Sequence, residues 1–290
     1  MTLPNLTPPN TLERLGETTI GPRTFAWGRR TYVMGILNVT PDSFSGDGLV
    51  ASDSAATVAA AVARARSMAD DGADLLDIGG ESTRPGHLPV EEAEELARVI
   101  PVVAAVRAAL PEMPLSIDTT KPGVAAAAIE AGADLVNDVW GVAPDDPLPR
   151  LAAERGVPIV LMHNRAEARY HDVVPEIVAD LEAAIERALA AGVARADILV
   201  DPGFGFGKTA EHNLALLRDL AGLRVLGCPI LLGTSRKSTL GKVLDLPADQ
   251  RVEATIATTV LGIAAGVDIV RVHDVRANAR AARMADAILR

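Results

Sequence analysis

Carboxylates and an amide stand at or near the ends of short apolar runs in this sequence. They are Asp77, Asp118, Asn137 and Asp201. Such side chains need partners when they face inward, because burying them unpaired costs several kcal/mol. One partner is a metal cluster, and another is a flat heterocycle whose adjacent N–H donors a carboxylate can bind with both oxygens. The carboxylates lie on separate runs, which favours the heterocycle without excluding a metal.

Basic side chains follow other apolar runs. They are Arg84, Arg236, Lys237, Arg271 and His273. Two of the segments involved, residues 79–86 and 233–238, are irregular, and backbone N–H groups of the second could hold an anion at a helix start. This combination predicts a phosphorylated or pyrophosphorylated ligand.

The glycine-rich segment at residues 201–209 (DPGFGFGKT) superficially resembles a nucleotide loop. A Walker A loop needs glycine five residues before the glycine that precedes Lys-Thr, and Pro202 occupies that place. In the dinucleotide fingerprint the third glycine would fall on Lys208. Both nucleotide interpretations are therefore rejected, and the segment is interpreted as a turn that brings Phe204 or Phe206 to the site.

These residues are positioned by a regular alternation of apolar runs and helical segments. Strands are predicted at residues 33–39, 75–79, 115–118, 135–139, 159–162, 198–201, 230–233 and 269–273, and helices include 55–70, 90–109, 123–131, 175–191, 251–265 and 276–289. Strands alternating with helices favour a parallel sheet. Eight of them favour closure into a (β/α)8 barrel over an open doubly wound sheet. The polar strand ends would then meet at one face, where barrel active sites lie.

Composition and charge fit one α/β domain. The 290 residues are 49% hydrophobic and 3% aromatic, and the net charge is −10, which argues against nucleic-acid or anionic-membrane partners. The single cysteine, Cys228, excludes an intrachain disulfide and is expected to be a buried structural thiol. A signal leader and a long apolar run are lacking, so a cytoplasmic location is expected.

The beginning of the chain differs from the rest. Residues 1–30 are rich in Pro, Thr and Gly and show no helical periodicity. They are predicted to form an irregular N-terminal arm, with a short hairpin over the barrel floor around residues 24–32. The barrel domain is expected at residues 31–290.

Several segments match a known family in order. Residues 34–45 (MGILNVTPDSFS) and 77–86 (DIGGESTRPG) resemble the two loop signatures of dihydropteroate synthases. Shorter matches are 116–119 (SIDT), 137–138, 201–208, 235–238 (SRKS) and 271–274 (RVHD). The resemblance covers about residues 32 to 290, and the two long signatures are highly specific.

The resemblance implies a (β/α)8 barrel transferase of folate biosynthesis. Such an enzyme joins p-aminobenzoate to the methylene carbon of 6-hydroxymethyl-7,8-dihydropterin diphosphate and releases pyrophosphate, with early cleavage of the C–O bond. It implies Mg²⁺ as a cofactor and a homodimer formed through the last helices. Two rivals are a pterin-binding paralogue without turnover and a methyltetrahydrofolate-dependent methyltransferase. The presence of Arg84, His273 and the loop at residues 79–86 disfavours the methyltransferase, and the two intact loop signatures disfavour the paralogue.

The resemblance also implies roles for individual residues. Asp118, Lys237, Arg271 and His273 are the expected catalytic residues, and Asn38 is the expected Mg²⁺ ligand. The expected substrate-binding residues are Phe44, Asp77, Thr83, Arg84, Pro85, Asn137, Met162, Asp201, Phe206, Ser235 and Ser238. Within these, Asp118, Asn137, Asp201 and Lys237 would bind the pterin, Arg84, Arg271 and His273 the diphosphate, and Phe44, Thr83, Pro85, Phe206 and Ser238 the aminobenzoate. After the fifth strand this chain has MHNR at residues 162–165 where many members have Met-His-Met, which puts detailed pterin contacts near Met162 in doubt.

Overall fold

Parallel strands form a closed barrel at the centre of the molecule. The computed structural model describes residues 15–40, 54–81, 89–141 and 143–290. The barrel strands are β3 (Tyr32–Asn38), β4 (Leu75–Gly79), β5 (Leu115–Asp118), β6 (Leu135–Asp138), β7 (Ile159–Met162), β8 (Ile198–Asp201), β9 (Leu231–Leu232) and β10 (Ile269–Val272). They pair in parallel in the order β8-β7-β6-β5-β4-β3-β10-β9, and a parallel bridge between Val200 and Ile230 joins the two edges.

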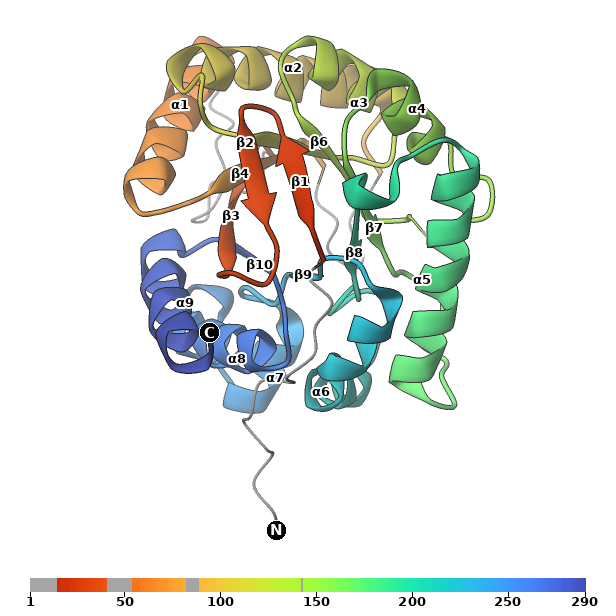
Figure 1. Ribbon diagram of the computed structural model, residues 1–290. Helices are drawn as coiled ribbons and strands as arrows, with labels where there is room; N and C mark the ends of the chain where they lie inside the picture. The colour runs from red at the N-terminus through yellow and green to blue at the C-terminus, as the bar shows by residue number, and fades with distance from the viewer. Residues whose placement is uncertain (1–14, 41–53, 82–88, 142) are drawn as a thin grey trace.

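Helices surround the barrel on its outer side (Figure 1). They are α1 (Ser54–Asp70), α2 (Glu92–Ala109), α3 (Pro122–Glu130), α4 (Leu148–Arg155), α5 (Val173–Ala190), α6 (Ala210–Arg218), α7 (Ser238–Leu244), α8 (Val252–Ala264) and α9 (Val275–Leu289). Short 3₁₀ turns occur at Arg195–Asp197, Leu220–Leu226 and Ala248–Gln250. The predicted (β/α)8 barrel is confirmed. The short helices α4, α6 and α7 were not among the predicted ranges.

The hydrophobic core has two parts. The larger part fills the space between the outer face of the barrel and the helices, and includes Leu76, Val103 and Leu181. Most barrel strands are buried on both faces, which explains why they read as continuous apolar runs. Cys228 is buried in this part, as predicted.

The smaller part of the core closes the amino-terminal end of the barrel. A hairpin of β1 (Glu17–Ile20) and β2 (Arg23–Ala26) lies across that end (Figure 1). Its Ile20 and Phe25 pack in one cluster with strand residues that include Met34, Leu135 and Leu199. The hairpin over the barrel floor is confirmed.

The predicted position of the hairpin, around residues 24–32, was wrong. The Gly21–Pro22 turn separates its two strands, and Gly21 has a φ of +55°. Gly-Pro is a turn signal, and the alternating residues on each side of it marked the two strands. Within the described ranges, no helix is long and apolar enough to cross a membrane.

Candidate active site

The predicted site residues gather at the carboxyl end of the barrel. Asp77, Asp118, Asn137, Asp201 and Arg271 stand on β4, β5, β6, β8 and β10. The parallel register sets Asn137 directly beside Asp118 and Met162 beside Asp201. Of the other predicted residues, Phe44, Thr83, Arg84 and Pro85 lie outside the described part of the chain.

Arg271 connects two carboxylates across the barrel interior. Its Nε donates to Oδ2 of Asp77 at 2.5 Å, and its Nη2 donates to Oδ2 of Asp118 at 2.6 Å. Asn137 Nδ2 donates to the same Asp77 oxygen at 3.0 Å. The planar, forked guanidinium presents two donors that reach different carboxylates. The four side chains therefore form one preorganised cluster. The sequence predicted that the carboxylates and the amide would gather, but it placed Arg271 in a separate group of anion-binding charges.

Some oxygens of this cluster have no hydrogen-bond partner among the described residues. They are Oδ1 of Asp77 and Oδ1 of Asp118, together with Oγ of Ser116 on β5. All three residues are buried. Burial raises the pKa of Asp118 to about 7, while the positive charge of Arg271 acts in the opposite direction. Unpaired acceptors at a strand end are suited to a ligand that brings N–H donors. Ser116 is an addition to the predicted set.

Lys237 lies on the other side of the cluster, just before α7. Its Nζ donates to the carbonyl of Phe204 and lies 4.4 Å from the centre of the Phe206 ring. Burial lowers the pKa of Lys237 to about 8, whereas the charge of Asp201 raises it. Burial raises the pKa of Asp201, and the charge of Lys237 lowers it. Lys237 is therefore held between a carboxylate, a carbonyl and an aromatic face.

The loop after β8, residues 203–207, has glycine at alternate positions. Gly203, Gly205 and Gly207 all have positive φ, at +67°, +86° and +54°. A Cβ at Gly203 would lie 1.8 Å from the carbonyl oxygen of His163, and one at Gly205 would lie 2.9 Å from Cδ of Lys237. Glycine is required here by backbone conformation and close approach. Of the two phenylalanines that the sequence offered, Phe204 is fully buried in the core and Phe206 lies beside Lys237.

His273 and Ser235 contact each other near the end of β10. The Oγ atom of Ser235 lies 2.9 Å from Nδ1 of His273 and accepts a hydrogen bond from its backbone N–H at 3.1 Å. Ser238 is exposed at the start of α7. Arg236, which the sequence grouped with the anion-binding charges, makes two hydrogen bonds to the carboxylate of Asp274, at 3.0 and 2.7 Å. That pair balances its charge within the protein.

A metal site built from protein side chains alone is not found in the described ranges, where no group of three His, Cys, Asp or Glu residues could hold an ion. Asn38 ends β3 beside Gly79 and is partly exposed. A single amide oxygen at a solvent-accessible strand end fits Mg²⁺, which is often bound by one or two protein oxygens together with substrate phosphates and water. The donor set is thus compatible with an ion that arrives with a diphosphate.

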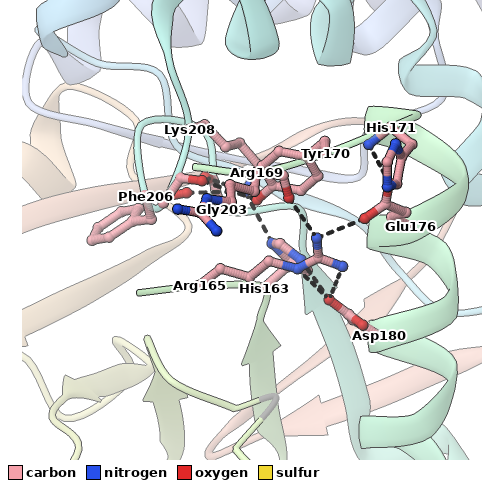
Figure 2. Close-up of polar contacts among 11 residues, drawn as sticks. His163, Arg165, Arg169, Tyr170, His171, Glu176, Asp180, Gly203, Phe206 and Lys208 are labelled. Atoms are coloured by element: carbon pink, nitrogen blue, oxygen red, sulfur yellow. Dashed lines mark hydrogen bonds and ion pairs between the residues drawn. The ribbon is translucent and has the colours of Figure 1, made fainter. Parts of the chain in front are cut away.

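A second polar cluster lies behind the loop and was not foreseen as a unit (Figure 2). His163 follows β7, and its Nε2 lies 3.0 Å from Oδ2 of Asp180 on α5. Its Nδ1 lies 2.9 Å from Nζ of Lys208. Arg165 also donates to Asp180, at 2.9 Å, and to Glu176, at 2.7 Å. Arg165 belongs to the MHNR segment that departs from the common family pattern.

Comparison with known proteins gives the same assignment as the sequence motifs. A family model described as pterin binding enzyme matches residues 34–273. A dihydropteroate synthase from Clostridium beijerinckii is 50% identical over 272 residues, which cover 93% of this chain and 99% of that protein. The chain belongs to the dihydropteroate synthase family. This family resemblance was predicted from the loop signatures and is confirmed.

Solved dihydropteroate synthases share the fold. The enzyme from Clostridium difficile, determined in the presence of pteroic acid, has a TM-score of 0.86 at 50% identity, and the match covers 91% of this chain and 98% of that one. The enzyme from Xanthomonas albilineans with 4-aminobenzoic acid has a TM-score of 0.86 at 43% identity, with 94% and 97% covered. Matches of this extent to named dihydropteroate synthases disfavour the methyltransferase alternative.

Proposed function

We propose that this protein is a dihydropteroate synthase that condenses p-aminobenzoate with 6-hydroxymethyl-7,8-dihydropterin diphosphate to give 7,8-dihydropteroate and pyrophosphate. One observation carries the proposal: two buried carboxylates, Asp77 and Asp118, share the guanidinium of Arg271 and each keep one unpaired oxygen at the carboxyl end of the barrel. Dihydropteroate synthases at 50% identity over most of the chain support the same reaction.

The pterin ring is recognised by the carboxylate and amide cluster. The ring carries adjacent N–H donors, which match the free Oδ1 of Asp118 and the carboxylate of Asp201. Asn137, fixed by its bond to Asp77, offers an amide that can both donate and accept. Lys237 donates to the ring from the side opposite the cluster, and Arg271 lies against the ring.

Charge at the site favours the reacting state. Asp77, Asp118 and Asp201 place three carboxylates beside the cations Lys237 and Arg271. Burial raises the pKa of Asp118, and the charges of both cations lower it against that rise. Breaking the bond between the pterin methylene and the diphosphate oxygen leaves a delocalised cation on the pterin, and the electron pair departs on pyrophosphate. Fixed negative charge around the ring stabilises that cation without reorganisation.

The leaving pyrophosphate is bound on the side of the methylene carbon that faces away from the pterin ring. His273, which Ser235 orients, would hold it together with Arg271 and the predicted Arg84. Asn38 would hold Mg²⁺, which when bound neutralises the charge that gathers on the departing oxygen. The positive groups near the end of β10 thus complement the leaving group.

The aminobenzoate would enter beside Phe206 and Ser238, with Met162 deeper in the site. Phe44, Thr83 and Pro85 are assigned to the same pocket by resemblance to the family. The nitrogen of the incoming aromatic amine is neutral near pH 7, so its lone pair attacks the methylene carbon without a general base. The ammonium product then releases its proton to pyrophosphate or water.

Three further assignments belong to the proposal. A homodimer through the last helices is supported by exposed apolar side chains on α8 and α9, where Leu261 is 60% and Ile288 69% exposed. A cytoplasmic location is also proposed, where a chain whose single cysteine, Cys228, is buried and free needs no disulfide. We also keep the division into an N-terminal arm at residues 1–30 and a barrel at 31–290.

The function is tested with purified protein, dihydropterin diphosphate and p-aminobenzoate. Dihydropteroate, followed by chromatography, and pyrophosphate should appear together and only when Mg²⁺ and both substrates are present. Omitting each component in turn is the control. Pterin binding in calorimetry without product formation would instead identify a binding paralogue and overturn the proposal.

A further inference from the structure

When protonated, Lys208 uses all three protons of its ammonium group to connect two backbone carbonyls and a histidine. Its Nζ lies 2.9 Å from Nδ1 of His163 and donates to the carbonyls of Gly203 and Phe206, both at 3.1 Å. An ammonium group has three donors, so all of them are used. Two of the bonds close the loop at residues 203–207 on itself, and the third ties it to the end of β7.

His163 connects Lys208 to helix α5. Below the lowered pKa of Lys208, about 7, its ammonium can only donate. Nδ1 of His163 then accepts, and the proton of the ring stands on Nε2, which donates to Asp180 at 3.0 Å. His163 is buried, and burial lowers its pKa to about 4, so the ring is neutral near pH 7. Arg165 donates a further hydrogen bond to the same Asp180 carboxylate (Figure 2). The loop is thus fixed to α5 through three side chains.

The loop has other attachments, but they act at its other residues and not at Phe206. Phe204 is fully buried in the core, the N–H of Gly205 donates to Oδ1 of Asn213 at 2.7 Å, and the carbonyl of Gly207 accepts from Tyr170 at 3.0 Å. Glycine at positions 203, 205 and 207 adds conformational freedom to the unfolded loop and supplies no side chain for packing. Close contact with the backbone of residues 163–165 is a condition of the fold, since a Cβ at Gly207 would lie 2.2 Å from the carbonyl oxygen of Arg165. Lys208 adds an attachment at the carbonyl of Phe206 itself, beside the core packing of Phe204.

The same loop presents two groups to the active site. The carbonyl of Phe204 accepts from Nζ of Lys237, and the Phe206 ring stands 4.4 Å from that nitrogen. Lys237 keeps a second anchor in the charge of Asp201, whereas Phe206 is placed by the loop. Movement of the loop would therefore shift Phe206 more than Lys237.

We propose that Lys208 is a positioning residue of the active site, which, through its bonds to His163, Gly203 and Phe206, fixes the loop that places the Phe206 ring. Its effect on turnover rests on the proposed function, while the attachment of the loop does not. Lys208 does not touch the reacting atoms. Its loss should weaken the use of p-aminobenzoate, on the Phe206 side, more than the binding of the pterin.

The test compares Lys208→Met with Lys242→Met, which removes an exposed lysine on α7. In Lys208→Met we expect KM for p-aminobenzoate to rise about tenfold, a size typical of losing hydrogen bonds to a charged group. The change in kcat and in the dissociation constant of dihydropterin diphosphate should stay below about threefold. Hydrogen exchange of the amides at residues 203–208 should become faster. Lys242→Met should match the wild type in all four measurements.

Other results would overturn the positioning role. One is unchanged KM and unchanged exchange in Lys208→Met, and another is a fall in kcat alone, as a partly unfolded sample would give. If Lys208→Met does not fold, His163→Leu removes only one of the three bonds and should shift KM and exchange in the same direction by less. A wild-type protein that makes no dihydropteroate would refute the proposed function, and the exchange measurement would still decide whether Lys208 fixes the loop.

Discussion

The guanidinium of Arg271 on β10 donates to the carboxylate of Asp77 on β4 across 2.5 Å, although β3 lies between the two strands in the sheet. The bond spans the barrel interior and places a positive charge at the centre of the acidic cluster. Asp118 shares the same guanidinium at 2.6 Å. One cation therefore orients two carboxylates before any ligand arrives.

Arg271→Met should destabilise the fold as well as abolish activity. Removing the shared cation leaves two buried carboxylates without their partner, which costs about 3–5 kcal/mol. Burial already raises the pKa of Asp118, and loss of the positive charge raises it further. The loss of stability should therefore be larger at pH 8 than at pH 5, where protonation relieves it. Urea unfolding at both pH values measures this, with exposed Arg150→Met on α4 as the control. Equal losses at both pH values would contradict it.

Asp201→Asn should weaken pterin binding by about 1.5–3 kcal/mol, as expected for loss of a charge-assisted hydrogen bond. The amide can no longer accept two N–H donors with equal strength. Calorimetry with dihydropterin diphosphate measures the effect. Asp219→Asn, at an exposed position after α6, is the matched control. Unchanged affinity in Asp201→Asn would remove this residue from the site.

Asn38→Ala should raise the Mg²⁺ concentration needed for half-maximal activity. The variant lacks the amide oxygen proposed as the protein ligand, while the diphosphate and water ligands remain. We expect an increase of about tenfold, comparable to the loss of one good hydrogen bond or ligand contact. A magnesium titration of initial rates measures it. If the Mg²⁺ dependence is the same as in the wild type, the ion is held elsewhere.

The stability of the protein should depend on pH through Lys208. Burial lowers its pKa from 10.5 to about 7 in the folded state, so between those values the unfolded chain binds more protons. Stability must then rise with pH across this window. The charged or titratable groups around it are Asp201, Lys237, Arg165, Asp180 and His163. Urea unfolding of the wild type and Lys208→Met from pH 7 to 10 should show the wild type gaining relative to the variant. Parallel curves would contradict the lowered pKa.

Leu261→Arg should convert the proposed dimer to a monomer. Leu261 is 60% exposed on α8, and a charge placed in an apolar interface is left without a partner. Sedimentation velocity reports the change. Val225→Arg, at a 71% exposed position in the 3₁₀ turn Leu220–Leu226, should leave the assembly intact. A wild-type protein that sediments as a monomer would disprove the dimer.

Sequence patterns predicted the barrel and the gathering of Asp77, Asp118, Asn137 and Asp201, because parallel strands bring their carboxyl ends to one face. A residue at the end of a barrel strand has its position in space set by the fold. The same logic located Arg271 but could not say that it binds two carboxylates.

The other contacts of the site could not be predicted, because they depend on the directions in which long side chains point. Arg236 follows a strand as Lys237 does, yet it pairs with Asp274 while Lys237 faces Phe204. Lys208 and His163 are 45 residues apart, and no spacing rule connects them. Periodicity fixes strands and helices, but the contact of two flexible side chains from different loops depends on three-dimensional packing that the sequence pattern does not display.

The β1–β2 hairpin limits where substrates can enter the barrel and where products can leave it. Since its Ile20 and Phe25 fill the amino-terminal end of the barrel, reactants and products must share the carboxyl end. The proposed pterin-binding residues Asp118 and Asn137 are buried, whereas Ser238 is exposed at the start of α7. Because the amino-terminal end is closed, the substrate that binds deeper, the dihydropterin diphosphate, is expected to bind first. The dihydropteroate formed from it is expected to leave last.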